Sequence, residues 1–528
     1  MERWRNRRAL GGVLAAVAGV VLVVVAVQPR PAALERGNTV VVNLDRPGIA
    51  AHNSPAVAVH PRRPEVLVVA DRIDTPRFSC SIWRSTNGGV TWESLPLPLA
   101  PEQPNCHAPD VAFTDTGDLL VLSTATGGRF NQPVGVWLHR FREDQPEGAP
   151  VVVAGPEAFH ARLATEGTRV LVTWVQAGPA AAEVPLGFPP PPNPVVLARS
   201  DDGGRSFGSP VKVSADDRLL LQPTVLFGPG GRVVIGALDL GADHSDYEAR
   251  HGGQGGPPSD EPWRVVSWTS DDRGATFGPA AVVADGVVPP SRIIVNLGPT
   301  PGFAWDMGSG RLYSVWDEGR ADSRDVFLAH SDDAGQTWSP ARAVLPRPGA
   351  QYLPAVGVAP GGRVDVAFYD RSADPADVLA EVTLASSNDG ATTFVATTVS
   401  ATAFDSRIGF GSAQDLPQLG SQLAVVSQED RALSFWADTT RGSVATNIQD
   451  LAMAAVEVTE AQGPRWPLAA TGGALLLVGA ILAWRPMGVA SVHAHRHLRQ
   501  GRRGQDQHRG GVVPAPRPRR PPRRRRRL

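Results

Sequence analysis

Short apolar segments recur along the chain in pairs, and each pair is joined by a turn rich in glycine or polar residues. Seven such pairs occur, at residues 55–71, 109–125, 160–176, 223–239, 301–317, 354–370 and 421–438. Their apolar residues either alternate with polar ones or form continuous runs, and both patterns are typical of β-strands bounded by turns. The chain is therefore predicted to repeat one all-β unit seven times.

A second motif, Ser-x-Asp/Asn-x-Gly-x-Thr/Ser-Trp/Phe, recurs with small variations at residues 85–92, 200–207, 270–277, 331–338 and 387–394. Its third positions are Asn87, Asp202, Asp272, Asp333 and Asp389. Glycine supplies backbone angles that other residues avoid, and the Asp or Asn side chain can accept hydrogen bonds from the turn. We interpret each copy as the tip of a β-hairpin. Calcium binding is a poor alternative, because the copies lack alternating oxygen ligands.

The motif resembles the Asp box, or bacterial neuraminidase repeat, of sialidases and related proteins. This resemblance implies a β-propeller, whose blades are four-stranded sheets around a central axis. The motif's final aromatic residues are separated by 115, 70, 61 and 56 positions, as Trp92, Phe207, Phe277, Trp338 and Phe394 show. The long first gap leaves room for one unit without a box, and another unit fits after residue 394. We predict seven blades over residues 38–460, with residues 39–43 completing the last blade, and six blades as the alternative.

Both ends of the chain carry apolar runs beside positive charge. Residues 1–8 are basic, and residues 9–27 are predicted to be a signal peptide or a transmembrane anchor. Residues 466–484 are predicted to be a transmembrane helix, followed by a disordered basic tail over residues 485–528. Positive flanks are expected in the cytoplasm, so the propeller is predicted to be extracytoplasmic, at the cell membrane or cell wall.

Residues 468–472 read Leu-Ala-Ala-Thr-Gly, which resembles a sortase cell-wall sorting signal. The resemblance implies a sortase and peptidoglycan as partners, whereas a plain stop-transfer helix with a chance pentapeptide is the alternative.

Charge is distributed unevenly along the chain. The formal net charge is −1, but residues 9–484 hold 33 basic and 50 acidic residues, a net charge of −17. An acidic central region argues against nucleic acid as a partner of the folded part. The two cysteines, Cys80 and Cys106, both lie in the region predicted to be exported, and an even count in an oxidising compartment favours a disulfide.

Charged residues recur at one place in the predicted blades. Aspartate ends the second strand in five units, and an arginine follows closely in four of them; a histidine precedes the first strand of the second unit. We expect ligand contacts from Asp71, Asp317, Asp438, Arg72, Arg320, Arg371, Arg441 and His107. The arginines could clamp a carboxylate. Alternatively, each Asp–Arg pair is a local brace that ties its loop to the neighbouring blade. Long inserts at residues 177–194 and 241–262 lie on the same predicted face.

The resemblance to sialidases implies hydrolysis with a tyrosine nucleophile, a glutamate partner, an aspartic acid/base and three arginines on the substrate carboxylate. Tyr352, Tyr369 and Asp370 are the candidates here. Neither tyrosine has an obvious glutamate partner in the same unit. The family's Arg-Ile-Pro motif is also absent, and residues 71–74 (Asp-Arg-Ile-Asp) come nearest to it. We therefore predict a surface-anchored propeller that binds a glycan or protein ligand without a cofactor or metal. An exo-acting glycoside hydrolase of sialidase type is the alternative.

Overall fold

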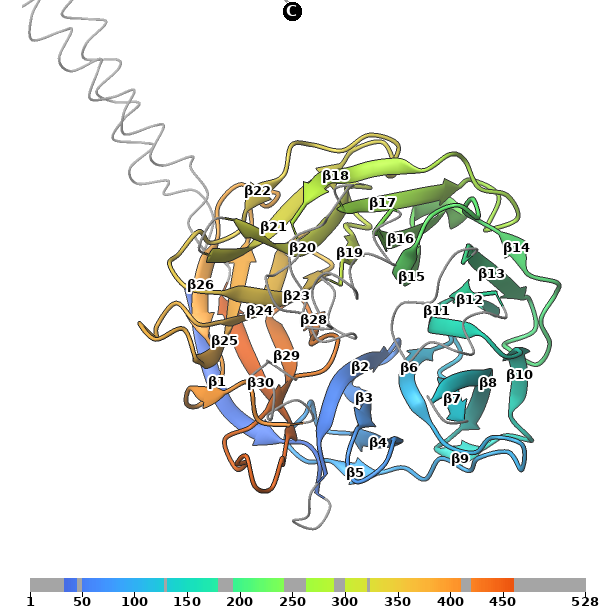
Figure 1. Cartoon of the computed structure of the whole chain (residues 1–528), viewed down its shortest axis with the longest axis horizontal. Coiled ribbons are helices and arrows are strands. Elements are labelled where there is room, and N and C mark those ends of the chain that lie inside the picture. Colours follow the sequence, from blue (N-terminus) through green and yellow to red (C-terminus); the bar gives the residue numbers. More distant parts are fainter. Residues whose placement is uncertain are drawn as a thin grey trace, which may run out of the picture. The chain divides into compact units, whose positions relative to one another are not determined.

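Antiparallel strand pairing organises the chain into seven sheets arranged around a central axis (Figure 1). The computed structural model describes residues 33–44, 50–127, 131–178, 193–241, 263–288, 300–320, 323–409 and 419–459. The predicted segments 1–8, 9–27, 466–484, 468–472 and 485–528 lie outside these residues, as do most of the two long inserts. Residues 27–464 form one compact unit.

In each blade the chain runs from the innermost strand outward, except that the outermost strand of the last blade comes from the N-terminal side of the chain. Blade 1 contains β2 (His52–His60), β3 (Arg63–Ile73), β4 (Ser79–Ser85) and β5 (Glu93–Ser94). Blade 2 contains β6 (His107–Phe113), β7 (Leu119–Gly127), β8 (Gln132–Arg142) and β10 (Val151–Ala154), with β9 (Gln145–Pro146) also paired to β8. Blade 3 contains β11 (Ala158–Glu166), β12 (Arg169–Gln176), β13 (Val195–Ser200) and β14 (Val211–Lys212). Blade 4 contains β15 (Leu220–Phe227), β16 (Val233–Asp239), β17 (Trp263–Ser270) and β18 (Ala281–Val287).

The remaining blades follow the same order. Blade 5 contains β19 (Gly302–Trp305), β20 (Leu312–Arg320), β21 (Ser323–Ser331) and β22 (Arg342–Ala343). Blade 6 contains β23 (Gln351–Val358), β24 (Val364–Asp370), β25 (Leu379–Ser387) and β26 (Val395–Thr398), with β27 (Phe404–Asp405) also paired to β25. Blade 7 contains β28 (Ala424–Ser427), β29 (Arg431–Asp438), β30 (Asp450–Thr459) and β1 (Ala33–Val41). We call the four strands of each blade A to D from the axis outward.

Blade 7 combines both ends of the described chain. β1 is its outermost strand and pairs with β30, so that Thr39 lies opposite Ala454. The Val42 amide extends this contact by donating to the Leu451 carbonyl over 2.7 Å. The prediction of seven blades, with residues 39–43 completing the last, is therefore confirmed, and the six-bladed alternative is wrong.

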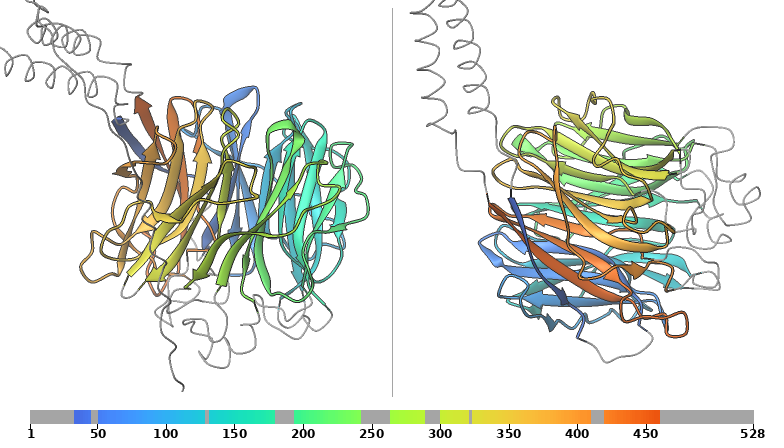
Figure 2. Two further views of the ribbon diagram at one scale, coloured as in Figure 1. Left: turned by 90° about the horizontal axis from the view of Figure 1, so that it is seen from above. Right: turned by 90° about the vertical axis from the view of Figure 1, so that its left-hand side faces the viewer.

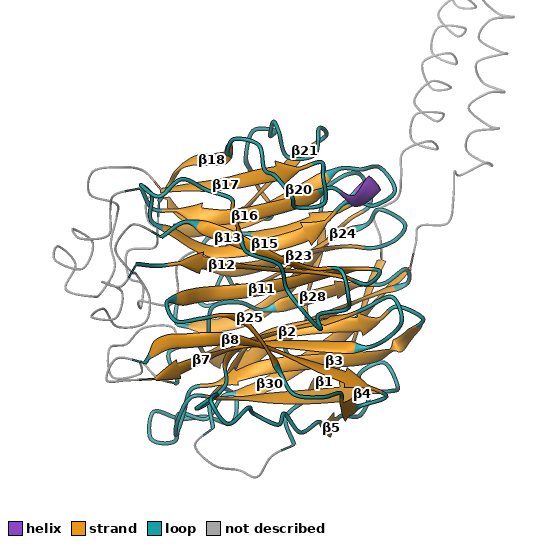
Figure 3. Cartoon of the chain, turned by 90° about the vertical axis from the view of Figure 1, so that its right-hand side faces the viewer, coloured by secondary structure: helices purple, strands orange, loops and turns teal. Residues whose placement is uncertain are grey.

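Strands and loops make up nearly all of the described residues, as two side views of the ring show (Figures 2 and 3). Residues 229–231 form a single turn of 3-10 helix between β15 and β16. None of the helical segments within the described ranges has the length and apolar character needed to cross a bilayer. The flanking hydrophobic helices of our prediction lie outside those ranges.

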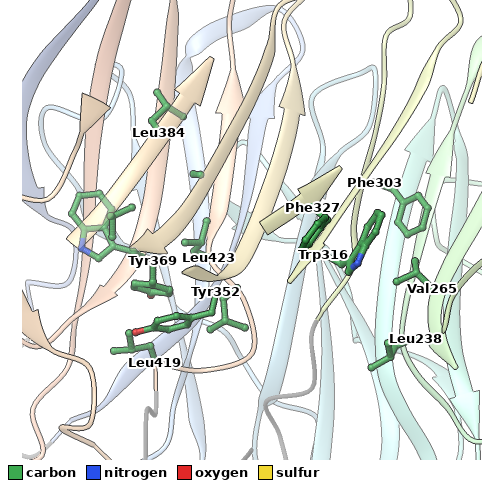
Figure 4. Close-up of a cluster of buried hydrophobic side chains, with 14 of the residues drawn as sticks. Leu238, Val265, Phe303, Trp316, Phe327, Tyr352, Tyr369, Leu384, Leu419 and Leu423 are labelled. Carbon is green, nitrogen blue, oxygen red and sulfur yellow. The ribbon is translucent and has the colours of Figure 1, made fainter. Parts of the chain in front are cut away.

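The hydrophobic core runs between the blades rather than inside one sheet. Strand B of most blades is buried over nearly its whole length, as in β16 and β24. Large aromatic side chains fill the space between neighbouring sheets: Trp92 of blade 1 meets Phe435 of blade 7 edge to face, with ring centroids 6.0 Å apart. Figure 4 shows a similar cluster, in which Trp316 lies beside Phe327. Because every blade buries apolar surface on both faces, the ring must close to remain stable.

The five predicted turns share one hydrogen-bonding pattern. In the turn of blade 5, Asp333 accepts from the Thr337 amide (2.8 Å) and from its hydroxyl (2.5 Å), while the Gly335 amide donates to Ser331 Oγ (2.8 Å). The equivalent side chains Asn87, Asp202, Asp272 and Asp389 each accept from the amide four residues later, over 2.8–2.9 Å. All five turns join strand C to strand D, so they lie on one face of the ring.

Blades 6 and 7 are joined by a buried arginine. The Arg363 guanidinium pairs with Asp365 (3.1 Å) and donates to the carbonyls of Glu429 and Gln428 in blade 7 (both 2.7 Å). Arg363 is 5% exposed and Asp365 is fully buried. The pair is thus satisfied by hydrogen bonds on both sides of the blade interface, which is the condition under which a buried ion pair is tolerated.

We predict that Arg363→Ala lowers the free energy of unfolding by about 3–5 kcal/mol, because Asp365 would remain buried without its partner. Denaturant titration of the full-length chain measures this loss. The matched control is Arg232→Ala, which removes a solvent-exposed pair with Asp271 and should cost no more than about 1 kcal/mol. Equal losses for the two variants would contradict the assignment.

Candidate functional site

A repeated irregularity shapes the innermost strands on the face opposite the C–D turns. In five blades a non-glycine residue near the start of strand A has positive φ, and the register with strand B shifts there; the residues are Ser54, Ala108, His160, Gln222 and Leu353. Proline follows four of them and has no amide proton to lose from the ladder. Positive φ at such residues costs energy and is often found at functional sites.

Three of these bulge residues, Ala108, His160 and Gln222, line a pocket formed mainly by blades 1 to 4. The innermost strands of these blades surround the middle of the ring in Figure 1. The polar lining of the pocket comes from the ends of β3 and β7, from residues near the starts of β6, β11 and β15, and from Ser421 before β28. The polar side chains that line it are Arg72, His107, Thr124, His160, Arg162, Gln222 and Ser421. The bulges matter because a one-residue shift decides which side chains face the axis.

Arg162 has unusual electrostatic surroundings. It donates across the ring to the side-chain oxygen of Gln422 in blade 7. Among the described residues no carboxylate lies within ion-pair distance of Arg162, although Asp110 lies nearby. Burial, together with the charge of Arg72, lowers the pKa of Arg162, and Asp110 opposes this shift. Arg162 donates to a neutral amide, and Asp110 offsets its charge only from a distance, so an anion in the pocket would be favoured.

Arg72, by contrast, is already paired. Its Nε lies 2.7 Å from Asp74, whose carboxylate also accepts from Asn53 over 2.9 Å. Arg72 is 5% exposed, so its position is well defined by packing. It adds positive potential to the pocket while Asp74 holds its orientation.

Two uncharged histidines complete the site. Burial and the nearby Arg72 lower the pKa of His107 to about 3. Burial and the charge of Arg162 lower the pKa of His160 to about 4. His160 accepts from the Gln222 amide (3.4 Å), whereas Nε2 of His107 is buried and has no hydrogen-bond partner among the described residues. A neutral imidazole nitrogen can exchange a hydrogen bond with a ligand hydroxyl.

The predicted disulfide is confirmed and lies beside the pocket. Cys80 of blade 1 is bonded to Cys106 of blade 2, with the Cα atoms 5.4 Å apart. Cys80 is the β4 partner of Arg72, and Cys106 directly precedes His107. The bond therefore fixes two pocket residues from neighbouring blades relative to each other.

The pocket gathers only two of the eight predicted ligand residues, Arg72 and His107. The predicted aspartates have other partners: Asp71 accepts from His52 (2.6 Å), Asp317 pairs with Arg324, and Asp438 accepts from the Trp436 indole (3.1 Å).

Two of the predicted arginines are also engaged outside the pocket. Arg371 donates to the Asp377 carbonyl (2.9 Å), and Arg441 pairs with Asp450 (2.6 Å). The side chain of Arg320 lies outside the described part. Arg72, Arg371 and Arg441 thus bond to groups other than the aspartate that ends their own strand B. The alternative of a local Asp–Arg brace stays a prediction for Asp317 and Arg320.

The three catalytic candidates lie together in blade 6, away from this pocket. Tyr352 and Tyr369 stack with centroids 5.4 Å apart, as Figure 4 shows. Tyr369 is fully buried, its hydroxyl accepts from the Ala437 amide (3.0 Å), and burial raises its pKa. Asp370 accepts from Thr383 (3.1 Å) and from the Ser372 amide (2.9 Å). These bonds assign Tyr369 and Asp370 to packing.

Tyr352 differs from its neighbour. The guanidinium groups of Arg324 and Arg371 lie over its ring, 5.4 and 5.3 Å from the ring centroid. Its buried hydroxyl has no hydrogen-bond partner among the described residues. Within the same residues, no group of three His, Cys, Asp or Glu side chains could hold a metal ion.

Arg162 and Ser421 were not predicted as site residues from the sequence, whereas His160 and Gln222 stand near the start of strand A, where ligand contacts were expected. A usable signal was present, since proline follows the bulge residue in four blades and the polar residues stand beside it.

The low pKa values of the histidines predict a pH dependence of stability. The unfolded chain binds more protons than the folded one from about pH 6.5 down to about pH 4, so stability falls as the pH falls through this window. Each histidine contributes at most about 1.4 kcal/mol per pH unit. Urea unfolding of a His107→Asn/His160→Asn variant should therefore depend less on pH between 6.5 and 5 than unfolding of the wild type. Identical slopes would show that the two imidazoles are not held neutral.

Comparison with known proteins gives no family for this chain. No family model and no curated protein matches the sequence. Among solved structures, a protein of unknown function from Dyadobacter fermentans is 14% identical, with a TM-score of 0.46, covering 81% of this chain and 99% of its own. A Hadza microbial sialidase is 14% identical, with a TM-score of 0.42 and coverage of 78% and 68%. An ulvan lyase from a new polysaccharide lyase family is 12% identical, with a TM-score of 0.47 and coverage of 77% and 94%. Likeness at this level carries no argument about activity.

Proposed function

We propose that this chain is a surface-anchored, extracytoplasmic propeller that binds an acidic glycan through the pocket around Arg162. The observation that carries the proposal is the guanidinium of Arg162, which has a neutral amide as its hydrogen-bond partner and a second arginine nearby. A carboxylate is the natural complement of such a group, because two parallel N–H donors match its two oxygens.

The other pocket residues suit a sugar rather than a simple ion. Thr124, Gln222 and Ser421 present hydroxyl or amide groups, and His107 has an unused ring nitrogen. Such groups recognise hydroxyls without adding charge. A sugar acid, such as a uronic or sialic acid at the end of a glycan, combines a carboxylate with hydroxyls in one small ligand.

Anchoring at the cell surface rests on the sequence alone. Apolar runs at residues 9–27 and 466–484, each beside arginines, support a propeller displayed outside the membrane. The pentapeptide at 468–472 supports attachment to peptidoglycan by a sortase, with a plain membrane helix as the other outcome.

A second candidate function is exo-acting glycoside hydrolysis of the sialidase type. Tyr352 favours it, because no hydrogen bond reaches its hydroxyl from the described part of the chain and two arginines lie over its ring. Release of fluorophore from an aryl sialoside, lost in Tyr352→Phe, would establish hydrolysis in place of simple binding.

The main test compares charged and neutral sugars. Calorimetric titration of the full-length chain with methyl glucuronide and methyl sialoside should show binding that methyl glucoside lacks. Arg162→Met should weaken it by about tenfold to a hundredfold, as expected for loss of a charge-assisted hydrogen bond. Arg441→Met is the control, because Arg441 pairs with Asp450 outside the pocket. Equal affinity for charged and neutral sugars, or an unaffected Arg162→Met variant, would reject an acidic-glycan site.

A further inference from the structure

Blade 2 is built differently from its neighbours on the face that carries the C–D turns. In blades 1, 3, 4, 5 and 6, strand C ends on a serine opposite a buried residue near the start of strand B, and the eight-residue turn begins there. In blade 2, Phe141 takes the serine's place opposite Leu119. The chain then reverses at once through Glu143 and Asp144, both with positive φ. The eight-residue turn is missing.

In other blades this turn fills the space beside the preceding blade. A Cβ added to Gly88 would lie 2.9 Å from Nη1 of Arg431 in blade 7, and one added to Gly390 would lie 3.0 Å from Nη1 of Arg311 in blade 5. Both arginines stand at or just before the start of strand B in the preceding blade. The turns thus pack against the neighbouring blade with no room for a side chain.

Blade 2 has a pocket of about 440 Å³ in the corresponding region, between its own tip and that of blade 1. Leu119 and Phe141, the two residues at the register position of the missing turn, line its buried floor. His60 and Phe113 form an aromatic wall, with ring centroids 5.2 Å apart. The space that other blades fill with their own chain is open here.

The pocket also offers an unused backbone acceptor. In blades 1 and 3 the turn donates an amide to strand A–B connections, from Gly88 to the Glu65 carbonyl and from Gly203 to the Thr168 carbonyl, both over 2.8 Å. Each accepting carbonyl lies two residues before the strand B residue that faces the end of strand C, which is Leu67 in blade 1 and Val170 in blade 3. In blade 2 that strand B residue is Leu119, and the residue two positions before it is Gly117. Within the described ranges, no hydrogen bond reaches the Gly117 carbonyl, and Gly117 lines the pocket.

Charges at the rim are only partly neutralised. Arg142 pairs with Asp118 (3.3 Å) and Asp144 with Arg84 (2.8 Å). Arg63 and Glu143, which also line the pocket, have no ion-pair partner among the described residues. A ligand of this pocket would meet both an unpaired cation and an unpaired anion. A polypeptide carries polar and charged groups that suit both, whereas a simple ion carries only one sign of charge.

We propose that this pocket is a docking site for a glycine-containing turn of a partner protein. Such a turn would donate a backbone amide to the Gly117 carbonyl and place an apolar side chain on Leu119 and Phe141. It would reproduce between two chains the packing that five blades make within one. The site lies on the opposite face from the acidic-glycan pocket and does not depend on it.

The test uses a backbone-cyclised peptide with the sequence of residues 200–207, Ser-Asp-Asp-Gly-Gly-Arg-Ser-Phe. Fluorescence anisotropy with the full-length chain should show saturable binding. A peptide with both glycines replaced by alanine should bind at least about tenfold more weakly, because alanine resists positive φ.

Protein variants locate the site. Thr116→Trp places a large side chain at the exposed rim and should weaken binding of the peptide by at least about tenfold. Val152→Trp, on the outer strand of blade 2 and 60% exposed, is the matched control and should leave binding unchanged. Arg162→Met should also leave it unchanged, which separates this site from the glycan pocket. Absence of saturable binding, or equal binding to Thr116→Trp with an unaltered melting temperature, would overturn the proposal.

Discussion

Pairing between β1 and β30 is the interaction on which the rest of the molecule depends. A propeller blade exposes apolar surface on both faces, so each sheet is stable only between two neighbours. The last blade receives its outer strand from the beginning of the chain, and this joins the first and seventh units. The inter-blade contacts, from the Trp92–Phe435 pair to the Arg363 bridge, all presuppose a closed ring.

The two faces of the ring have different tasks. One face carries the C–D turns. In these turns the Asp or Asn side chains accept hydrogen bonds from backbone amides, and the glycines pack against the preceding blade. The other carries the bulges, the disulfide and the cluster of Arg72, Arg162, His107 and His160. Different features therefore mark the two candidate sites: a bulge that recurs in the inner strands of five blades, and a missing turn in blade 2.

Most of the fold could be predicted from the sequence because its signals are local. Alternating strands and turns gave the number of blades, residues 39–43 could be assigned to the closing strand, and the cysteines fell in adjacent units. The site could be predicted only in part, through Arg72 and His107. Arg162 was missed because its orientation depends on a bulge two residues earlier, where His160 has positive φ. The aspartates that end strand B were misleading, since each is satisfied inside the scaffold, as Asp71 is by His52. The segments at both ends lie outside the described residues, so the anchoring prediction still rests on the apolar runs and their flanking arginines.

The register of the closing strand has a mechanical consequence. Ala33 lies opposite Thr459, so the chain enters and leaves the propeller at the same end of one strand pair. If both ends are tethered to one surface, tension on a captured ligand pulls β1 and β30 in the same direction. The two strands then neither slide past each other nor separate, and the force acts on blade 7 as one unit. A tether at the C-terminus alone would load β30 while β1 resists through its hydrogen bonds in shear. Cleavage at the N-terminal side would thus change the force that the ring withstands without altering a single contact within it.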